Sequence, residues 1–242
     1  MALTKTRKKW RRVFGAMRRL YKNPNDLEAA FIIFNWLSSR SVRKQYERFR
    51  RTPVGSRVIV SSESLVDVLD DVDRLKALPV GSLGHEYSKF LVETSRSTSQ
   101  FADDTKKRGE KPSESAFNCY IRWYRDQHDL THTVTGYERN PFGEVVLLWF
   151  LHGNFANFGI IAMTIPMTIT HARKKGWGVF AASFEAYRNG RKAQWLAGMD
   201  WPSMLDLPLI EVKSSMQVGS PVKYQELMFS LRASKRPARE SA

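Results

Sequence analysis

The apolar residues of this sequence recur at helical spacing along almost its whole length, and this pattern limits the fold more than any other feature. Between Ser64 and Leu78 they stand three or four positions apart, as one face of a helix requires. No stretch alternates apolar and polar residues over the length of a strand, and Val58 to Val60 is the only strand-like fragment. The sequence therefore predicts an all-α protein, a single multi-helix domain of roughly nine to eleven helices.

The length and the cysteine count narrow the class further. A chain of 242 residues, 42% of them hydrophobic, can bury one large core. The single cysteine, Cys119, excludes an internal disulfide and a cysteine-based metal site, and we expect it in or near the core. The phosphate-binding GxxxxGK[ST] and GxGxxG patterns and the GxSxG elbow are all missing, so nothing indicates a nucleotide-binding enzyme or a serine hydrolase.

The net charge of +15 is concentrated at the two ends of the chain. Residues 1–22 hold nine Lys or Arg and no acid, with apolar residues at helical spacing among them. This basic amphipathic arm is either a membrane-surface element or an arm whose apolar side packs on the domain. Residues 219–242 form a basic tail that we expect to be flexible, which leaves residues 23–218 as the helical domain.

One short stretch carries the residues best suited to chemistry. His128 and His132 stand four positions apart, so on a helix they share one face, and Asp129 lies at the edge of that face. Upstream apolar residues continue the same face, which predicts one helix from about residue 113 to 135. Asn140-Pro141 then turns the chain, and Glu144 falls in the first turn of the next helix. We expect His128, Asp129, His132 and Glu144 to meet between these two helices.

Two imidazoles and two carboxylates are ligands that suit a divalent metal: zinc before others, with iron or manganese as alternatives. Asp129 is either a direct ligand or a hydrogen-bond acceptor for an imidazole N–H, and the spacing does not separate the two. The plain alternative is a histidine pair that holds no metal. The HExxH pattern of zinc proteases is absent. The Ile- and Met-rich segment at 155–170 is either an apolar wall beside the metal or ordinary core.

The spaced motif His128-Asp129-x-x-His132, followed by Glu144, resembles the signature of the fourth Coq protein of ubiquinone biosynthesis. The segments 78–90 and 200–212 are also similar to that family, and the resemblance covers about residues 15–218. The sequence resembles a bacterial homologue in that family. The resemblance implies a protein of the ubiquinone (coenzyme Q) pathway in which His128, Asp129, His132 and Glu144 are the metal ligands and the catalytic residues.

The resemblance also implies an activity and partners. The expected reaction is a metal-dependent oxidative decarboxylation, which replaces the carboxyl at ring carbon 1 of a polyprenylated hydroxybenzoate by hydroxyl. Expected partners are this prenyl lipid, the membrane surface, other ubiquinone-biosynthesis proteins and a second copy as a homodimer, but not nucleic acid. The expected location is peripheral, on the cytoplasmic face of a bacterial inner membrane or the matrix side of the mitochondrial one. A non-catalytic lipid-binding scaffold and an HD-type metal phosphohydrolase are the alternatives.

Overall fold

The computed structural model describes residues 11–19, 26–94 and 115–235 of the chain. From residue 26 onward these described residues form thirteen α-helices, ten of them seven residues or longer, and no β-strand. Residues 11–19 are also helical. The prediction of an all-α protein is therefore confirmed, and three helices of four to six residues account for the larger number.

The helices follow one another with short connections, and their bounds are α2 (Leu27–Phe49), α3 (Pro53–Ser61), α4 (Leu65–Leu69), α5 (Val72–Ala77), α6 (Leu83–Thr94), α8 (Ala116–Asp126), α9 (His128–Thr135), α10 (Pro141–Phe155), α11 (Phe158–Lys175), α12 (Gly178–Lys192), α13 (Trp201–Met204), α14 (Leu209–Ser215) and α15 (Val222–Lys235), with a 3-10 turn η1 (Leu196–Gly198) before α13.

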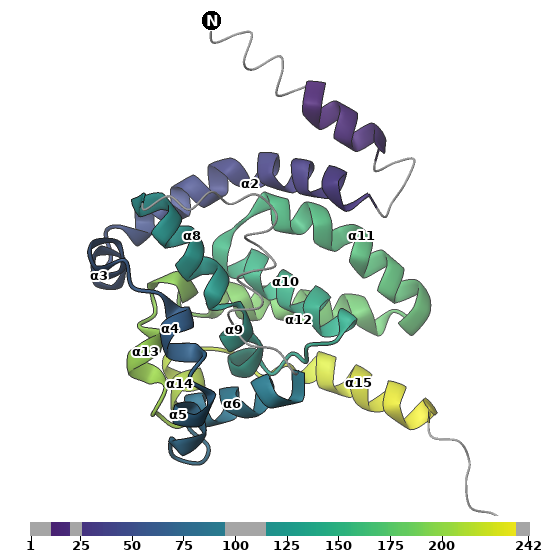
Figure 1. Cartoon of the computed structure of the whole chain (residues 1–242). Coiled ribbons are helices and arrows are strands. Elements are labelled where there is room, and N and C mark those ends of the chain that lie inside the picture. The colour runs from purple at the N-terminus through teal and green to yellow at the C-terminus, as the bar shows by residue number, and fades with distance from the viewer. Residues whose placement is uncertain (1–10, 20–25, 95–114, 236–242) are drawn as a thin grey trace, which may run out of the picture.

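The helices form two groups around α9 and α10 (Figure 1). In one group α10 packs along α12, α11 contacts both, α2 lies across α11, and α15 lies along α12. In the other group α6, α8 and α14 surround α9, while α4 and α5 pack on the outside against α8 and α6. Because α9 contacts α6, α8, α10 and α14, the motif histidines are held by elements from both groups.

The predicted motif helix is in fact two helices, α8 and α9, with Gln127 between them. Gln127 is buried, and its side-chain oxygen accepts a 2.9 Å hydrogen bond from the indole N–H of Trp201. The backbone N–H of Gln127 makes a long, 3.4 Å bond to the Trp123 carbonyl, so the helical ladder weakens at this residue. A contact from a distant segment therefore fixes a break that the local apolar pattern does not show.

Other boundaries differ from the sequence pattern for local reasons. The predicted helix from Ser64 to Leu78 is divided because the Asp71 carboxylate accepts the N–H of Arg74 and caps a new helix, α5. The strand-like fragment at residues 58–60 lies within α3. The tail expected to be flexible from residue 219 needs correction, since α15 occupies residues 222–235 and packs on α12. Residues 1–10 and 20–22 of the basic arm lie outside the described residues.

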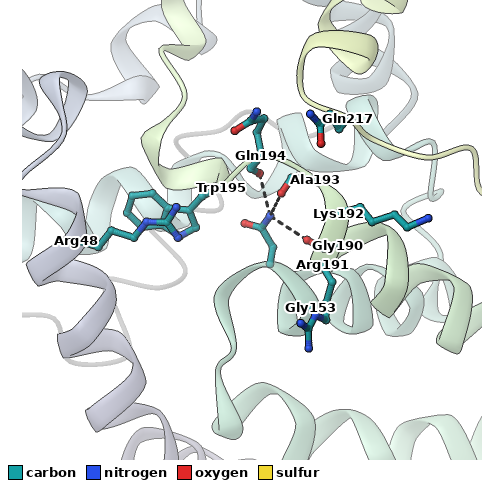
Figure 2. Close-up of a pocket in the computed structure, with 10 residues that line it drawn as sticks. Arg48, Gly153, Gly190, Arg191, Lys192, Ala193, Gln194, Trp195 and Gln217 are labelled. Atoms are coloured by element: carbon teal, nitrogen blue, oxygen red, sulfur yellow. Dashed lines mark hydrogen bonds between the residues drawn. The ribbon is translucent and has the colours of Figure 1, made fainter.

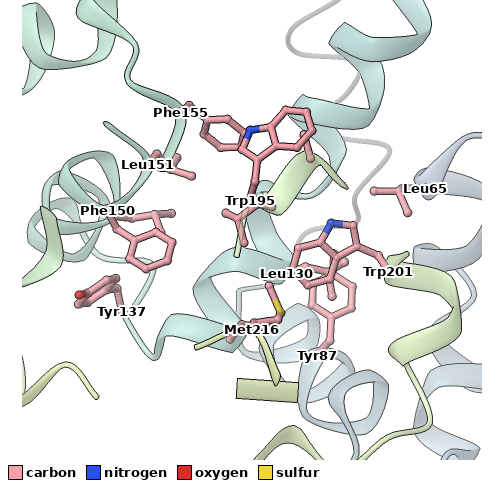
Figure 3. Packing of buried hydrophobic residues seen from close by; sticks show 14 of the residues in the cluster. Leu65, Tyr87, Leu130, Tyr137, Phe150, Leu151, Phe155, Trp195, Trp201 and Met216 are labelled. Carbon is pink, nitrogen blue, oxygen red and sulfur yellow. The ribbon is translucent and has the colours of Figure 1, made fainter. Parts of the chain in front are cut away.

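The core is one continuous cluster that passes directly behind α9. Tyr87 of α6, Leu130 of α9 and Met216 after α14 lie near Trp201, and all four are fully buried (Figure 3). Burying one such side chain stabilises the fold by about 1.5–3 kcal/mol. Cys119 is also buried, as its neighbours in the sequence indicate. The metal-motif helix is therefore held in place by hydrophobic packing of its opposite face.

The two outlying segments that resemble the Coq family lie side by side. The N–H groups of Leu83 and Gly84 donate to the carbonyls of Leu207 and Leu205 at 2.9 and 2.7 Å, and Leu209 N–H donates to Gly81 at 2.9 Å. A Cβ atom on Gly84 would lie 3.0 Å from the carbonyl oxygen of Leu205 and 2.4 Å from a methyl of Leu78, so glycine at this position favours the close pairing. The pairing fixes the start of α6, the helix that leads to the motif.

Asn154 joins the end of α10 to the chain that follows α12. Its amide nitrogen donates to the carbonyls of Gly190 and Gln194 at 3.2 and 2.9 Å, and more weakly to that of Ala193 at 3.4 Å (Figure 2). Its amide oxygen accepts the N–H of Leu196 at 3.1 Å. One side chain thus satisfies backbone groups that the end of a helix leaves without partners.

Candidate metal centre

The helix α9 presents the two histidines because its other face is buried. Leu130 and Val134 are completely buried on that face, and Gly136, with a φ of 77°, ends the helix in the left-handed conformation. His132 is 1% exposed and His128 is half-buried, so the pair lies at the inner end of a partly open site. Their rings are 5.0 Å apart and nearly perpendicular.

Glu144 reaches the same place from the start of α10. The side chain of Asn140 accepts the N–H groups of Phe142 and Gly143 at 3.0 and 2.8 Å, which caps the helix, and Pro141 occupies its first turn. A Cβ atom on Gly143 would lie 1.8 Å from the carbonyl oxygen of Glu138, so the turn and the helix approach more closely than any other residue allows. This approach sets the position of Glu144.

The four residues singled out in the sequence lie together. His132 Nε2 is 3.3 Å from Glu144 Oε1, and His128 Nε2 is 3.6 Å from Glu144 Oε2. Asp129 lies beside His128, with 3.1 Å between its Oδ1 and the Nδ1 of that imidazole. Ligand atoms of His128, Asp129 and His132 all lie within 4.8 Å of one another, and the described ranges hold no other group of three or more such residues.

The hydrogen bonds of His132 determine which of its two nitrogens can bind a metal. Its Nδ1 is 2.8 Å from the carbonyl oxygen of Tyr137, and because a carbonyl only accepts, Nδ1 carries the proton. In the neutral imidazole the lone pair is then on Nε2, which is buried and has no hydrogen-bond partner. This lone pair faces the carboxylate of Glu144, another acceptor, at 3.3 Å. Two facing acceptors repel unless a cation, either a proton or a metal ion, lies between them.

The two carboxylates are held in the ionised form that binds metal. Burial by itself raises the pKa of Glu144, but the two adjacent imidazoles of His132 and His128 and the positive charge of Arg139 outweigh it, so the net pKa is lowered. For Asp129, burial is likewise opposed by the hydrogen bond from His128 and by the positive charge of Arg139, and its pKa is also lowered. Both groups are therefore anionic at neutral pH.

The spacing of the donors fits a small divalent ion. Zinc binds imidazole nitrogen and carboxylate oxygen at about 2.0–2.2 Å, which puts neighbouring ligand atoms of a tetrahedral site about 3.3–3.6 Å apart. The contacts of the imidazoles with the Glu144 carboxylate, 3.3 Å from His132 to Oε1 and 3.6 Å from His128 to Oε2, are of that size and end on its two different oxygens. A donor set of nitrogen and oxygen without sulfur also suits iron(II) and manganese.

Three further residues shape the site, and the sequence pattern did not single them out. Arg139 donates to Asp129 Oδ2 at 3.3 Å, and its guanidinium lies 5.9 Å from the ring centre of Phe90. Phe90, on α6, stacks on the imidazole of His132 with ring centres 5.6 Å apart. The third is Tyr137, which acts through its backbone. Arg139 could have been anticipated from the sequence, because a buried aspartate beside two neutral imidazoles needs a positively charged partner, and Arg139 lies ten residues after Asp129.

His152 also lies on α10, but its contacts are at the far end of that helix from the metal centre. Its Nδ1 lies 2.9 Å from the carbonyl of Asn157, and its ring stacks on Tyr187. It stands eight residues after Glu144 on one helix, a rise of about 12 Å. His152 therefore supports the end of α10 and has no part in the metal site.

Comparison with known proteins agrees with the motif. The model of a family described as "Coenzyme Q (ubiquinone) biosynthesis protein Coq4" matches residues 22–221, which include both helices of the site. The chain belongs to the Coq4 family. Coq4 proteins take part in ubiquinone biosynthesis, and this places the chain in that pathway.

Individual Coq4 relatives are distant but extend over most of the chain. The mitochondrial COQ4 homologue of Rattus norvegicus is 23% identical over 219 residues, which cover 87% of this chain and 78% of the rat protein. The Danio rerio homologue is 24% identical over 205 residues, or 83% and 72% of the two chains. A crystal structure of a Nostoc punctiforme protein superposes with a TM-score of 0.60 at 17% identity, covering 89% of this chain and 99% of that one, so the two share a fold.

Proposed function

We propose that this Coq4 protein holds a divalent metal ion with His128, His132 and Glu144, and that the metal centre serves the oxidative decarboxylation of a polyprenylated hydroxybenzoate. The observation that carries the proposal is the buried lone pair of His132 Nε2, which faces the Glu144 carboxylate at 3.3 Å without a donor between them. A metal ion suits this arrangement, because His132 donates its Nδ1 proton to the Tyr137 carbonyl and so keeps the Nε2 lone pair available for a metal.

Asp129 has a separate role in this proposal. If His128 donates its Nδ1 proton to Asp129, both imidazoles direct their Nε2 atoms toward Glu144, and both have Nδ1 fixed by an oxygen acceptor. Such acceptors orient metal-binding histidines and make them better ligands. Arg139 holds the other oxygen of Asp129, so the carboxylate keeps its charge and orientation. We therefore assign Asp129 to positioning His128.

The reaction replaces a carboxyl group by a hydroxyl group, and its balance needs an oxidant. One molecule of dioxygen, two electrons from a reductant and two protons convert the aromatic acid to the phenol, carbon dioxide and water. A bound metal would supply a positive charge for the carboxylate and phenolate oxygens of the ring. The protein's own contribution is a half-closed site in which Phe90 covers one imidazole and excludes water from it.

A membrane location for this activity rests on the helix at residues 11–19. Val13 and Ala16 are buried, whereas Phe14 and Met17 are 62% and 41% exposed, so the helix combines both expectations for the arm. Arg19 pairs with Asp26 at 2.9 Å and Glu28 at 2.7 Å, which ties the helix to the start of α2. The exposed apolar side chains and the remaining basic residues suit the surface of an anionic membrane.

The function is tested with Glu144→Gln, which keeps the size of the side chain and removes its charge. The variant should lose most of its metal and fail to restore ubiquinone synthesis in cells that lack their own Coq4 protein. A matched control is Glu226→Gln, at an exposed ion pair with Lys223 on α15, which should behave as the wild type. Full restoration of ubiquinone synthesis by a metal-free Glu144→Gln protein would refute the enzymatic function and favour a non-catalytic lipid-binding scaffold.

The metal should contribute little to folding. The opposite face of α9 and most of α10 are buried, with Leu130, Val145 and Val146 at 0% exposure, so both helices are held by apolar contacts. Small zinc domains unfold without their metal because they have no such core. Loss of activity by Glu144→Gln is therefore expected in a protein that still melts cooperatively.

A further inference from the structure

Away from the metal centre, the neighbouring helices α11 and α12 carry exposed apolar side chains. On α12, Trp177 before the first turn, Phe180 and Phe184 recur at spacings of three and four, and they are 86%, 40% and 62% exposed. On α11, Ile165 and Ile169 are 45% and 40% exposed. The opposite face of α12 packs in the core. The aromatic side chains of α12 therefore remain exposed to solvent, although an amphipathic helix usually buries its apolar face.

Between the two rows lies a groove of about 380 Å³. Its floor comes from Trp149 of α10, whose indole N–H donates to Thr168 at 2.8 Å. Ser183 lies in the same groove, is 3% exposed, and its hydroxyl has no hydrogen-bond partner. A buried hydroxyl without a partner is rare in a packed core, and here it marks a groove that can receive a ligand with an apolar body and an oxygen atom.

The charges around this surface are almost all of one sign. From Phe158 to Lys192 the chain has six Lys or Arg and one acid, Glu185. Glu185 accepts the backbone N–H of Lys223 at 3.0 Å and so is turned toward α15. Exposed Arg173 and Lys174 lie at one end of the two helices, and exposed Arg188 lies at the other. Anionic groups would therefore meet basic side chains at both ends of the apolar groove.

We propose that this α11–α12 face docks on an anionic phospholipid bilayer and that the groove takes up one lipid chain. A tryptophan with basic residues beside it is typical of the boundary between headgroups and hydrocarbon. No helix of the described chain is long and apolar enough to cross a membrane, so contact by a face is the geometry that fits. A second copy of the chain fits less well, because a symmetric contact would bring the same basic residues together.

This surface is distinct from the metal centre and from the arm, although it shares α10 with the former. Trp149 stands five residues after Glu144, a rise of about 7.5 Å along the helix. Docking through the α11–α12 face would bring the back of the metal-bearing helix close to the membrane. The inference does not depend on the proposed chemistry, and vesicle binding tests it without any activity measurement.

The test compares variants of the full chain in co-sedimentation with vesicles of phosphatidylcholine and phosphatidylglycerol. The double variant Trp177→Ser, Phe184→Ser should lower the partition coefficient at least about tenfold, since each aromatic group loses its apolar contact. Phe229→Ser is the matched control, because Phe229 is 76% exposed but lies on α15, and it should bind as the wild type does. Arg173→Gln with Lys174→Gln should weaken binding to anionic vesicles and leave the little binding to pure phosphatidylcholine unchanged.

Unchanged binding of the aromatic double variant would overturn the proposal, since the arm is intact in every variant. An equal loss from Phe229→Ser would also overturn it, because the effect would then be general. If the double variant turns a dimer into a monomer in light scattering while vesicle binding is unchanged, the face is an interface between copies and the bilayer proposal is wrong. Circular dichroism confirms that each variant is folded, which is expected because the replaced side chains are exposed.

Discussion

Gly143→Ala is the substitution that tests most sharply how the backbone positions Glu144. Gly143 immediately precedes Glu144, and both stand in the first turn of α10. The added methyl group would lie 1.8 Å from the carbonyl oxygen of Glu138 and 2.8 Å from its carbonyl carbon. Neither atom belongs to a flexible side chain, so the turn and the helix have to move apart.

The size of this movement follows from the contact itself. Real Cβ atoms come no closer than 3.0 Å to such neighbours, so the present 1.8 Å must grow by about 1.2 Å or more. Metal sites tolerate about 0.2 Å of error in ligand distance, which is several times smaller. We expect a loss of metal affinity of about 10–100-fold, as for other changes that disturb the support of a ligand. Stability should fall by about 1–3 kcal/mol, as overpacking generally costs.

The assay is zinc competition with a chromophoric chelator, with urea unfolding of the same samples. Gly15→Ala is the control, because Gly15 is helical and an added Cβ atom there would have nothing within 4 Å. This variant should match the wild type in zinc affinity, and in urea it should be at least as stable, because alanine favours a helix more than glycine does. If Gly143→Ala binds zinc within about twofold of the wild type, the close approach to Glu138 does not position Glu144, and the reasoning is refuted.

Two further predictions concern the stability of the fold. Asn154→Ala removes the side chain that satisfies the carbonyls of Gly190 and Gln194 and the N–H of Leu196, so it should lower the free energy of unfolding in urea by about 2 kcal/mol; a change below about 0.5 kcal/mol would contradict this. Asp200→Asn tests a pH effect, because the hydrogen bonds from Arg57 at 2.7 and 2.8 Å hold the pKa of Asp200 below its ordinary value. A carboxyl with a lowered folded pKa stabilises above its unfolded pKa of about 4, and this stabilisation is lost as the pH falls through the folded value. The wild type should therefore be the more stable protein at pH 7, by about 1 kcal/mol or less since both groups are partly exposed, and the difference should disappear on acidification; a difference that grows toward low pH would show that the sign is wrong.

The fold class was predictable from the sequence because helical spacing of apolar residues needs only local information. The break at Gln127 was not, because it depends on Trp201, which is 74 positions away along the chain. The division of the helix predicted at 64–78 could have been predicted, since Asp71 is a residue type that often caps the start of a helix. The same local reasoning missed α15, whose polar and basic composition hides the side that packs on α12.

The site was predictable in part for the same reason. The spacing of His128 and His132 fixes their common face, and Asn140-Pro141 marks the start of the helix that carries Glu144. The contribution of Phe90 required knowing that α6 packs on α9, and the carbonyl of Tyr137 has no signature in the sequence. Ile165 and Ile169, in the segment expected as a wall or as core, are instead partly exposed on the α11–α12 face. Which apolar stripes remain on the surface depends on how many neighbours a helix finds, and composition does not show this.

Binding of one metal ion between His128, His132 and Glu144 is tested most directly by anomalous diffraction at the zinc absorption edge. The crystals would contain the protein supplied with one equivalent of zinc. We expect a single strong peak within about 2.0–2.2 Å of the Nε2 atoms of both histidines and of a Glu144 oxygen. A map with no peak there, or with zinc bound only at surface histidines such as His85, would contradict the proposed metal centre.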